Sequence, residues 1–121
     1  MNIGDVNFIR NKLMPWCEVD KLYIAQSNSE KKWPDIWVEM RDIPMITVTQ
    51  EWARQSMHER RKRLVHEIIG HLKFGWAHND FMDKVGFSTY PDKDTMSKEI
   101  YNDLLRGQIK RPHLYIKRVL K

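Results

Sequence analysis

The residues best suited to chemistry lie in one short stretch, His66-Glu67-Ile68-Ile69-Gly70-His71, with His78 a little further on. Imidazole nitrogens and carboxylate oxygens are common protein ligands of zinc. Two histidines that share one ion on a helix are normally four residues apart, because four steps bring the side chains back to within about 40° of each other. His66 and His71 are five residues apart. On an ideal α-helix this spacing separates them by about 140°, too far to share one tetrahedral ion.

Gly70 is the additional residue between the two histidines. One extra residue can be absorbed as a single π-type turn, and such turns are often found at functional sites. Glycine has no side chain to push outward at the bulge, although it weakens a helix by about 0.8 to 1.0 kcal/mol relative to alanine. We therefore expect a π-type turn that brings His66 and His71 together. In a competing register, Glu67 pairs with His71 at i and i+4, as a metal ligand or a helix-surface partner.

The elements ahead of this stretch follow from the apolar pattern. Three segments alternate or are rich in β-branched residues, which is typical of strands. These segments are 21–26, 36–41 and 45–49. A short helix over residues 5–14 is expected to end before Pro15. Thr49 can cap a helix whose first turn carries Glu51 and then Trp52.

The stretch itself belongs to a predicted helix over 59–74. This helix has an apolar stripe through Leu64 and Ile68, and we expect it to end at Gly75. The four consecutive basic side chains at 60–63 point in different directions around this helix, so they cannot all contact one phosphate backbone. We therefore expect them to form a solvated helix face. Residues 76–93 are expected to be irregular. Ser97 can then cap a last helix that ends at Arg106, before Gly107.

Composition favours one compact domain spanning 1–121, since the chain has 121 residues, 41% of them hydrophobic and 31% charged. It has no apolar run of roughly 18 residues and no apolar block near its start, so we expect a soluble cytoplasmic protein without a membrane partner. The single cysteine, Cys17, cannot form an internal disulfide.

The net charge is +5, and residues 104–121 hold six Lys and Arg and no acid. The basic excess is therefore a tail at 106–121.

The stretch 66–71 resembles the His-Glu-x-x-His signature of zincin-type zinc metallopeptidases, and its glycine resembles the His-Glu-x-x-Gly-His variant of the dipeptidyl peptidase III family. From about Ile46 through Leu105 the chain is also similar to very small single-domain zincins, the minigluzincins. This similarity rests on the segments 47–54 and 86–91 and on Asp94 and Ser97. The resemblance implies an α+β, zincin-like fold: a small sheet packed on a long metal-binding helix, with a following C-terminal helix.

The resemblance also implies roles for individual residues. His66 and His71 would bind Zn²⁺, and Glu67 would act as general base on the bound water and pass the proton to the leaving amine. Zinc lowers the pKa of its water to around 7 and polarises a substrate carbonyl. The activity implied is zinc-dependent hydrolysis of peptide bonds in a peptide or protein substrate.

The third protein ligand has two candidates. His78 keeps the Gly-x-x-His ending of the metzincins, although one residue too many precedes the glycine, and Met96 is loosely similar to a Met-turn residue. Gluzincins instead use a glutamate on the following helix, and Glu99 is the only glutamate after Glu67. We favour His78, with Asp80 as a weaker option.

A second interpretation comes from the basic tail. A protein of zincin architecture could bind nucleic acid or a protein partner through residues 106–121, with zinc structural or absent. A site closed by four protein ligands would leave no position for water and would not hydrolyse peptides.

Overall fold

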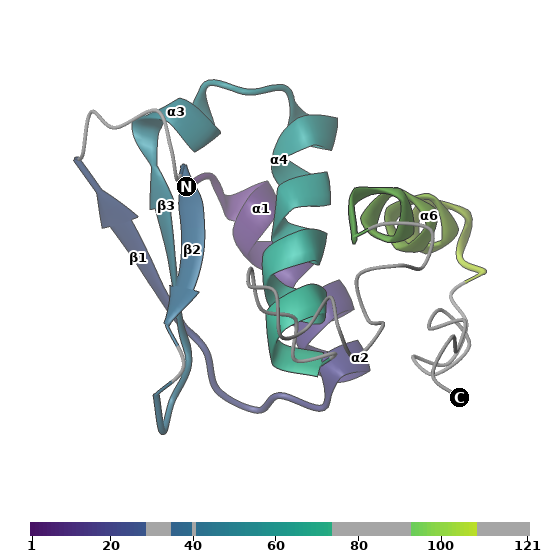
Figure 1. Cartoon of the computed structure of the whole chain (residues 1–121), viewed down its shortest axis with the longest axis horizontal. Helices are drawn as coiled ribbons and strands as arrows, with labels where there is room; N and C mark the ends of the chain where they lie inside the picture. Colours follow the sequence, from purple (N-terminus) through teal and green to yellow (C-terminus); the bar gives the residue numbers. More distant parts are fainter. Residues whose placement is uncertain (29–34, 40, 74–92, 109–121) are drawn as a thin grey trace.

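The computed structural model describes residues 1–28, 35–39, 41–73 and 93–108, with the backbone alone at 71–73 and 93–96 (Figure 1). The elements, in order, are α1 Ile3–Phe8, η1 Ile9–Leu13, α2 Met14–Cys17, β1 Tyr23–Ser27, β2 Ile36–Glu39, β3 Met45–Thr49, α3 Gln50–Ala53, α4 Met57–Leu64, η2 Val65–Lys73 and α6 Lys93–Arg106. The segments η1 and η2 are π-helical, so their hydrogen bonds join residues five apart. The α+β class expected from the sequence is confirmed. No helix in the described ranges is long and apolar enough to span a bilayer.

The sheet has three strands in the order β1-β3-β2, with β3 parallel to β1 and antiparallel to β2. The predicted strands are confirmed, with shifts of one or two residues at their ends. Ile24, Ile46 and Val38 lie side by side across the sheet. They share the face that packs into the core, because alternate residues of a strand point to the same side.

The helix formed by α4 and η2 is the central layer of the molecule. Figure 1 shows the sheet on one side of it and α6 on the other, and η2 contacts β2, α2, η1 and α6. The predicted apolar stripe is buried in these contacts: Leu64, Val65, Ile68 and Ile69 are at most 1% exposed. The sequence therefore forms a helix that is covered from several sides.

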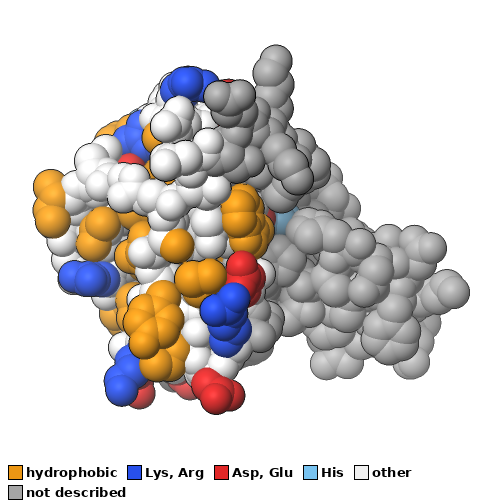
Figure 2. Space-filling model, turned by 90° about the vertical axis from the view of Figure 1, so that its left-hand side faces the viewer, with side chains coloured by type: hydrophobic (Ala, Val, Ile, Leu, Met, Phe, Trp, Pro, Cys, Tyr) orange, Lys and Arg blue, Asp and Glu red, His pale blue; other side chains and the backbone are white. Residues whose placement is uncertain are grey.

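No described helix covers the opposite face of the sheet, which Figure 2 shows. Tyr23 is 59% exposed there, and Trp37 is half-buried. Thr47 lies between Ala25 and Trp37, and its buried hydroxyl has no hydrogen-bond partner among the residues that the structure describes. Apolar and polar side chains are mixed on this face, as on a sheet with one solvated side.

The N-terminal helical region differs from the expectation that it ends before Pro15. It begins at Ile3, changes to π-helical bonding at Ile9 and continues to Cys17. Pro15 is tolerated because it occupies the first turn of α2, where a missing backbone N–H loses little. The chain leaves the helix at Glu18, which has a φ of 58°.

The last helix starts earlier than expected. It begins at Lys93, so Ser97 is an internal residue and not its N-cap. Its end before Gly107, whose φ of +67° suits glycine, is confirmed. The predicted cap at Thr49 is also confirmed, since its Oγ1 accepts a hydrogen bond from the Trp52 backbone N–H at 3.3 Å. The predicted stop at Gly75 and residues 76–92 of the segment predicted to be irregular lie outside the described residues. Lys93, the last residue of that segment, is helical.

The expectation of a solvated basic face at 60–63 is wrong. Arg60 Nε lies 3.0 Å from the buried carboxylate of Asp5, and Arg61 Nε lies 3.5 Å from the same carboxylate. Arg63 Nη1 lies 3.1 Å from the buried carboxylate of Asp35. The guanidinium groups of Arg60 and Arg61 also lie over the rings of Trp52 and Phe8. Acids from other elements turn these cations inward, which no pattern within the helix could reveal.

Asp5 is expected to be a major stabilising residue because it neutralises two partly buried cations. Asp5→Asn keeps the shape but leaves Arg60 and Arg61 without their anion, and we expect the free energy of unfolding to fall by about 3 kcal/mol. Chemical denaturation measures this change. Glu51→Gln removes the partner of Arg54 in an exposed pair and is the matched control, with an expected loss of less than about 1 kcal/mol. Equal losses in the two variants would contradict the assignment.

Candidate metal centre

The π-helical bonding of η2 places the two predicted ligand positions in register. Hydrogen bonds between residues five apart bring the backbone of His71 one turn beyond His66 on the same side of the helix. The π-type turn expected at Gly70 is therefore confirmed. It is longer than one turn, since η2 has 9 residues.

Burial explains the composition of this segment. Glu67, Ile68, Ile69 and Gly70 are all buried, whereas His66 is half-buried. A helix surrounded on nearly every side needs apolar or very small residues, so Gly70 fits a position that is both buried and π-helical. Glu67 is the exception, a carboxyl group 9% exposed within an apolar segment. Such a group is a functional candidate, because burial of a charge is otherwise unfavourable.

The environment of Glu67 disfavours its charged form. Its pKa is raised from 4.5 to about 8, first because burial removes water from the carboxylate and second because the Asp35 carboxylate repels it. The Arg63 guanidinium, one turn earlier on the helix, opposes this shift. In the metal-free chain Glu67 is thus mainly protonated at neutral pH.

A cluster of polar side chains at the start of β2 holds the Asp35 carboxylate near Glu67. The Asp35 carboxylate accepts hydrogen bonds from Arg63 Nη1 at 3.1 Å and Gln55 Nε2 at 2.6 Å. Arg63 Nε in turn donates to Gln55 Oε1 at 3.0 Å. The Asp35 carbonyl accepts from the Thr49 hydroxyl at 2.8 Å. The cluster therefore ties β2 and β3 to the helix one turn before Glu67.

His66 meets α6. Its Nδ1 lies 3.5 Å from the Oγ of Ser97, a residue 4% exposed. The contact joins the first predicted ligand to the helix that follows it in the sequence.

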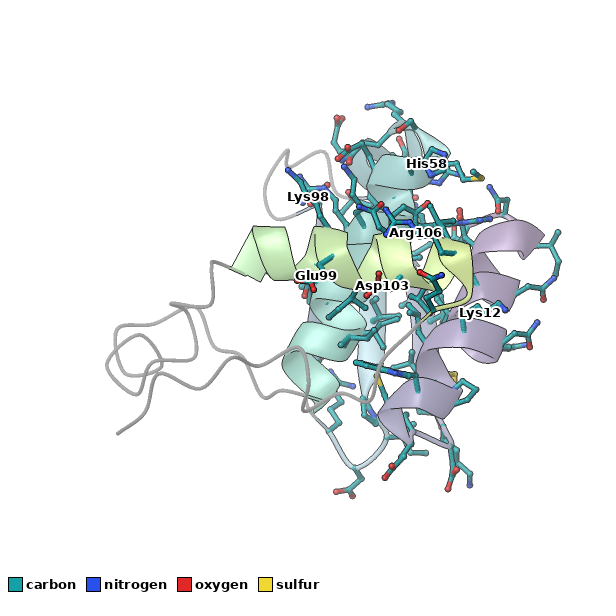
Figure 3. All side chains as sticks on the ribbon, turned by 90° about the vertical axis from the view of Figure 1, so that its right-hand side faces the viewer. Lys12, His58, Lys98, Glu99, Asp103 and Arg106 are labelled. Atoms are coloured by element: carbon teal, nitrogen blue, oxygen red, sulfur yellow. The ribbon has the colours of Figure 1, made fainter. Side chains whose placement is uncertain are left out.

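Glu99, the alternative third ligand, also lies on α6 and is half-buried. It follows Ser97 by two residues, which places it about 200° further round the helix. Figure 3 shows Glu99 and Asp103 on a side of α6 away from Lys98. Ser97 lies on the same helix, and its Oγ is 3.5 Å from Nδ1 of His66.

Several predicted site residues lie outside the described part. These are His78, Asp80 and the side chain of His71. Among the residues that are described, no three His, Cys, Asp or Glu side chains gather as a metal site. Met96, predicted as loosely similar to a Met-turn residue, lies within helix α6 and not in a turn.

Sequence reasoning missed Asp35, Gln55 and Ser97 as neighbours of the site. Arg63 carried a usable signal, because it precedes Glu67 by four residues and four-residue spacing pairs side chains on a helix. The contacts of the other three join distant segments, and no local pattern marks them.

Comparison of the chain with models of protein families, with curated proteins and with solved structures finds no match.

Glu67 predicts a specific pH dependence of stability for the metal-free protein. Between about pH 4.5 and 8 the unfolded chain releases this proton while the folded chain keeps it, so folding becomes less favourable as the pH rises. Glu67→Gln removes this contribution. We expect the variant to be more stable than the parent by on the order of 3 kcal/mol at pH 7 and by almost nothing near pH 4.5.

Chemical denaturation of both proteins at several pH values, with a chelator present, measures the difference. Glu51→Gln, at a partly exposed acid on α3, serves as control. A stability difference between the Glu67 variant and the parent that does not grow with pH would contradict the raised pKa.

Proposed function

We propose that this protein is a zinc-dependent metallopeptidase with a zincin-like arrangement. The observation that carries the proposal is η2, whose π-helical register aligns positions 66 and 71 and holds a buried carboxyl group beside them. This register compensates for the five-residue spacing, which an α-helix would not accommodate.

The donor types fit zinc. His66 supplies an imidazole that a neighbouring hydroxyl orients, and oriented imidazoles are typical of zinc sites. His71 occupies the matching position one π-turn later. When bound, zinc supplies Lewis acidity to polarise the substrate carbonyl and to acidify water.

Glu67 is suited to proton transfer. A pKa of about 8 makes it a stronger base than an ordinary glutamate. A cation held by the adjacent histidines would favour its ionised form, because an opposite charge nearby lowers a carboxyl pKa. Glu67 would then take the proton of the attacking water and return it to the leaving amine.

The placement of Ser97 supports His78 as the third ligand. Ser97 occupies a side of α6 that meets His66, and position 99 lies about 200° further round that helix. His78 follows η2 closely in the chain and needs no contribution from α6.

The strand β2 supports an extended peptide as substrate. It is an edge strand of the described sheet and contacts η2. Edge strands present backbone donors and acceptors that pair with an extended chain. A peptide added to β2 would therefore run close to the helix that carries Glu67.

The basic-partner interpretation rests on the tail at 106–121 and stays an alternative. Arg60, Arg61 and Arg63 are paired with buried acids and are not presented together to an outside anion. The tail at 109–121 lies outside the described residues.

Zinc content tests the proposed metal site. After dialysis against zinc and then buffer, we expect about one zinc per chain in the parent protein, and loss of zinc in His66→Ala, His71→Ala and His78→Ala. Glu99→Ala is expected to keep its zinc. Elemental analysis with circular dichroism measures metal and folding together.

His113→Ala is the matched control for this series, since it removes a histidine that is at none of the proposed ligand positions. Absence of zinc in a folded parent protein would defeat the proposal. Salt-sensitive binding of nucleic acid would then favour the basic tail.

Peptide hydrolysis tests Glu67 separately from the metal. Glu67→Gln is expected to retain zinc and to lower kcat by about 10² to 10⁴, because proton transfer is lost while binding remains. Mass spectrometry of a mixed peptide library detects cleavage without knowledge of the preferred sequence. Full activity in this variant would remove Glu67 from the catalytic role.

A further inference from the structure

We propose that Ser97 is a positioning residue for His66: its Oγ accepts a hydrogen bond from Nδ1–H and so directs the lone pair of Nε2 toward the metal. The contact joins α6 to η2 over 3.5 Å between residues 31 positions apart. The inference deepens the proposed zinc site and rests on it.

The role of Ser97 depends on which ring nitrogen of His66 carries the proton. A neutral imidazole carries its proton on one nitrogen and a lone pair on the other. If Nδ1 donates to Ser97, Nε2 is the nitrogen able to bind a metal. If Ser97 instead donates to Nδ1, Nε2 holds the proton and cannot bind. The same contact therefore allows His66 to bind a metal or prevents it, depending on which of the two atoms donates the hydrogen bond.

The position of Ser97 within a helix favours acceptance. A serine inside a helix can donate its hydroxyl proton to the carbonyl oxygen of the preceding turn. That bond uses the proton of the hydroxyl and leaves lone pairs on Oγ for a second donor. Nδ1–H of His66 is placed to be that donor. Because Ser97 is 4% exposed, water competes little for the bond.

The orientation of α6 is held by contacts away from the site. Ile100 is fully buried and Tyr101 is 2% exposed, and both share the helix face that carries Ser97. The Tyr101 hydroxyl also lies 2.5 Å from Nδ1 of His58 on α4. These contacts fix how α6 is rotated, so Oγ of Ser97 stays directed at His66. The following helix thereby contributes to the site without supplying a ligand.

A merely structural role for Ser97 would be that of a small residue at a helix crossing. Alanine preserves that role, because it is equally small and favours helix. Ser97→Ala therefore removes the hydrogen bond while keeping the packing. Ser97→Thr restores the hydroxyl and serves as the rescue variant.

The experiment measures zinc affinity and the His66 tautomer in the full chain. Competition with a chromophoric chelator gives the zinc dissociation constant, and ¹⁵N NMR of the zinc-free protein reports which ring nitrogen carries the proton. We expect Ser97→Ala to weaken zinc binding by about 10- to 100-fold and to shift His66 away from the Nδ1–H form. Ser97→Thr is expected to retain most of the affinity and the parent tautomer.

Ser56→Ala is the matched control. Ser56 is the N-cap of α4, where its Oγ accepts from the Glu59 backbone N–H at 3.3 Å, so this variant loses a serine hydrogen bond on the same long helix without touching His66. It is expected to lower Tm but to leave zinc affinity and tautomer unchanged.

Two results would overturn the assignment of Ser97. One is parental zinc affinity in Ser97→Ala, and the other is a parent protein in which His66 carries its proton on Nε2. If the parent protein binds no zinc, the proposed function fails, while the tautomer measurement still decides the role of Ser97.

Discussion

Hydrogen bonding between residues five apart in η2 is the constraint on which the rest of the structure depends. It lets Gly70 enter the helix without displacing the buried residues on either side, so η2 keeps its contacts with the sheet and with α6. The same bonding sets positions 66 and 71 one turn apart. An α-helical version would rotate one position away from the other and disturb the packing of the apolar stripe.

The charges near this segment are organised by burial. Asp5 and Asp35 are almost fully buried, and each is neutralised by an arginine of α4. Arginine suits this purpose because its planar group pairs with carboxylates while its stem packs on apolar surface. Burial and the nearby Asp35 carboxylate raise the pKa of Glu67 to about 8. Asp103, a further buried acid, pairs with Arg106 on its own helix α6. Glu67 is therefore a basic carboxyl group that adjoins His66 in the chain.

Much of the fold could be predicted because its signals are local. The strands follow from β-branched residues, Thr49 from cap chemistry, and the π-type turn from a glycine between two histidines. Two predicted helix boundaries were wrong. Pro15 and Ser97 are typical of helix ends, but the helix at Pro15 continues to Cys17 and the last helix already begins at Lys93. At the candidate site the sequence identified Glu67 and the histidine spacing, but not the hydrogen bond between Ser97 and His66.

The sequence by itself determined the α+β class, the helix that carries the histidines and the need for a non-α turn within it, since each depends on residues less than two turns apart. Only the tertiary structure decided that the cations at 60, 61 and 63 point inward, that Asp35 lies close enough to raise the pKa of Glu67, and that Ser97 of α6 contacts His66. The physical reason is distance along the chain. Contacts between residues dozens of positions apart form when buried surfaces pack together, and no spacing within one segment records them.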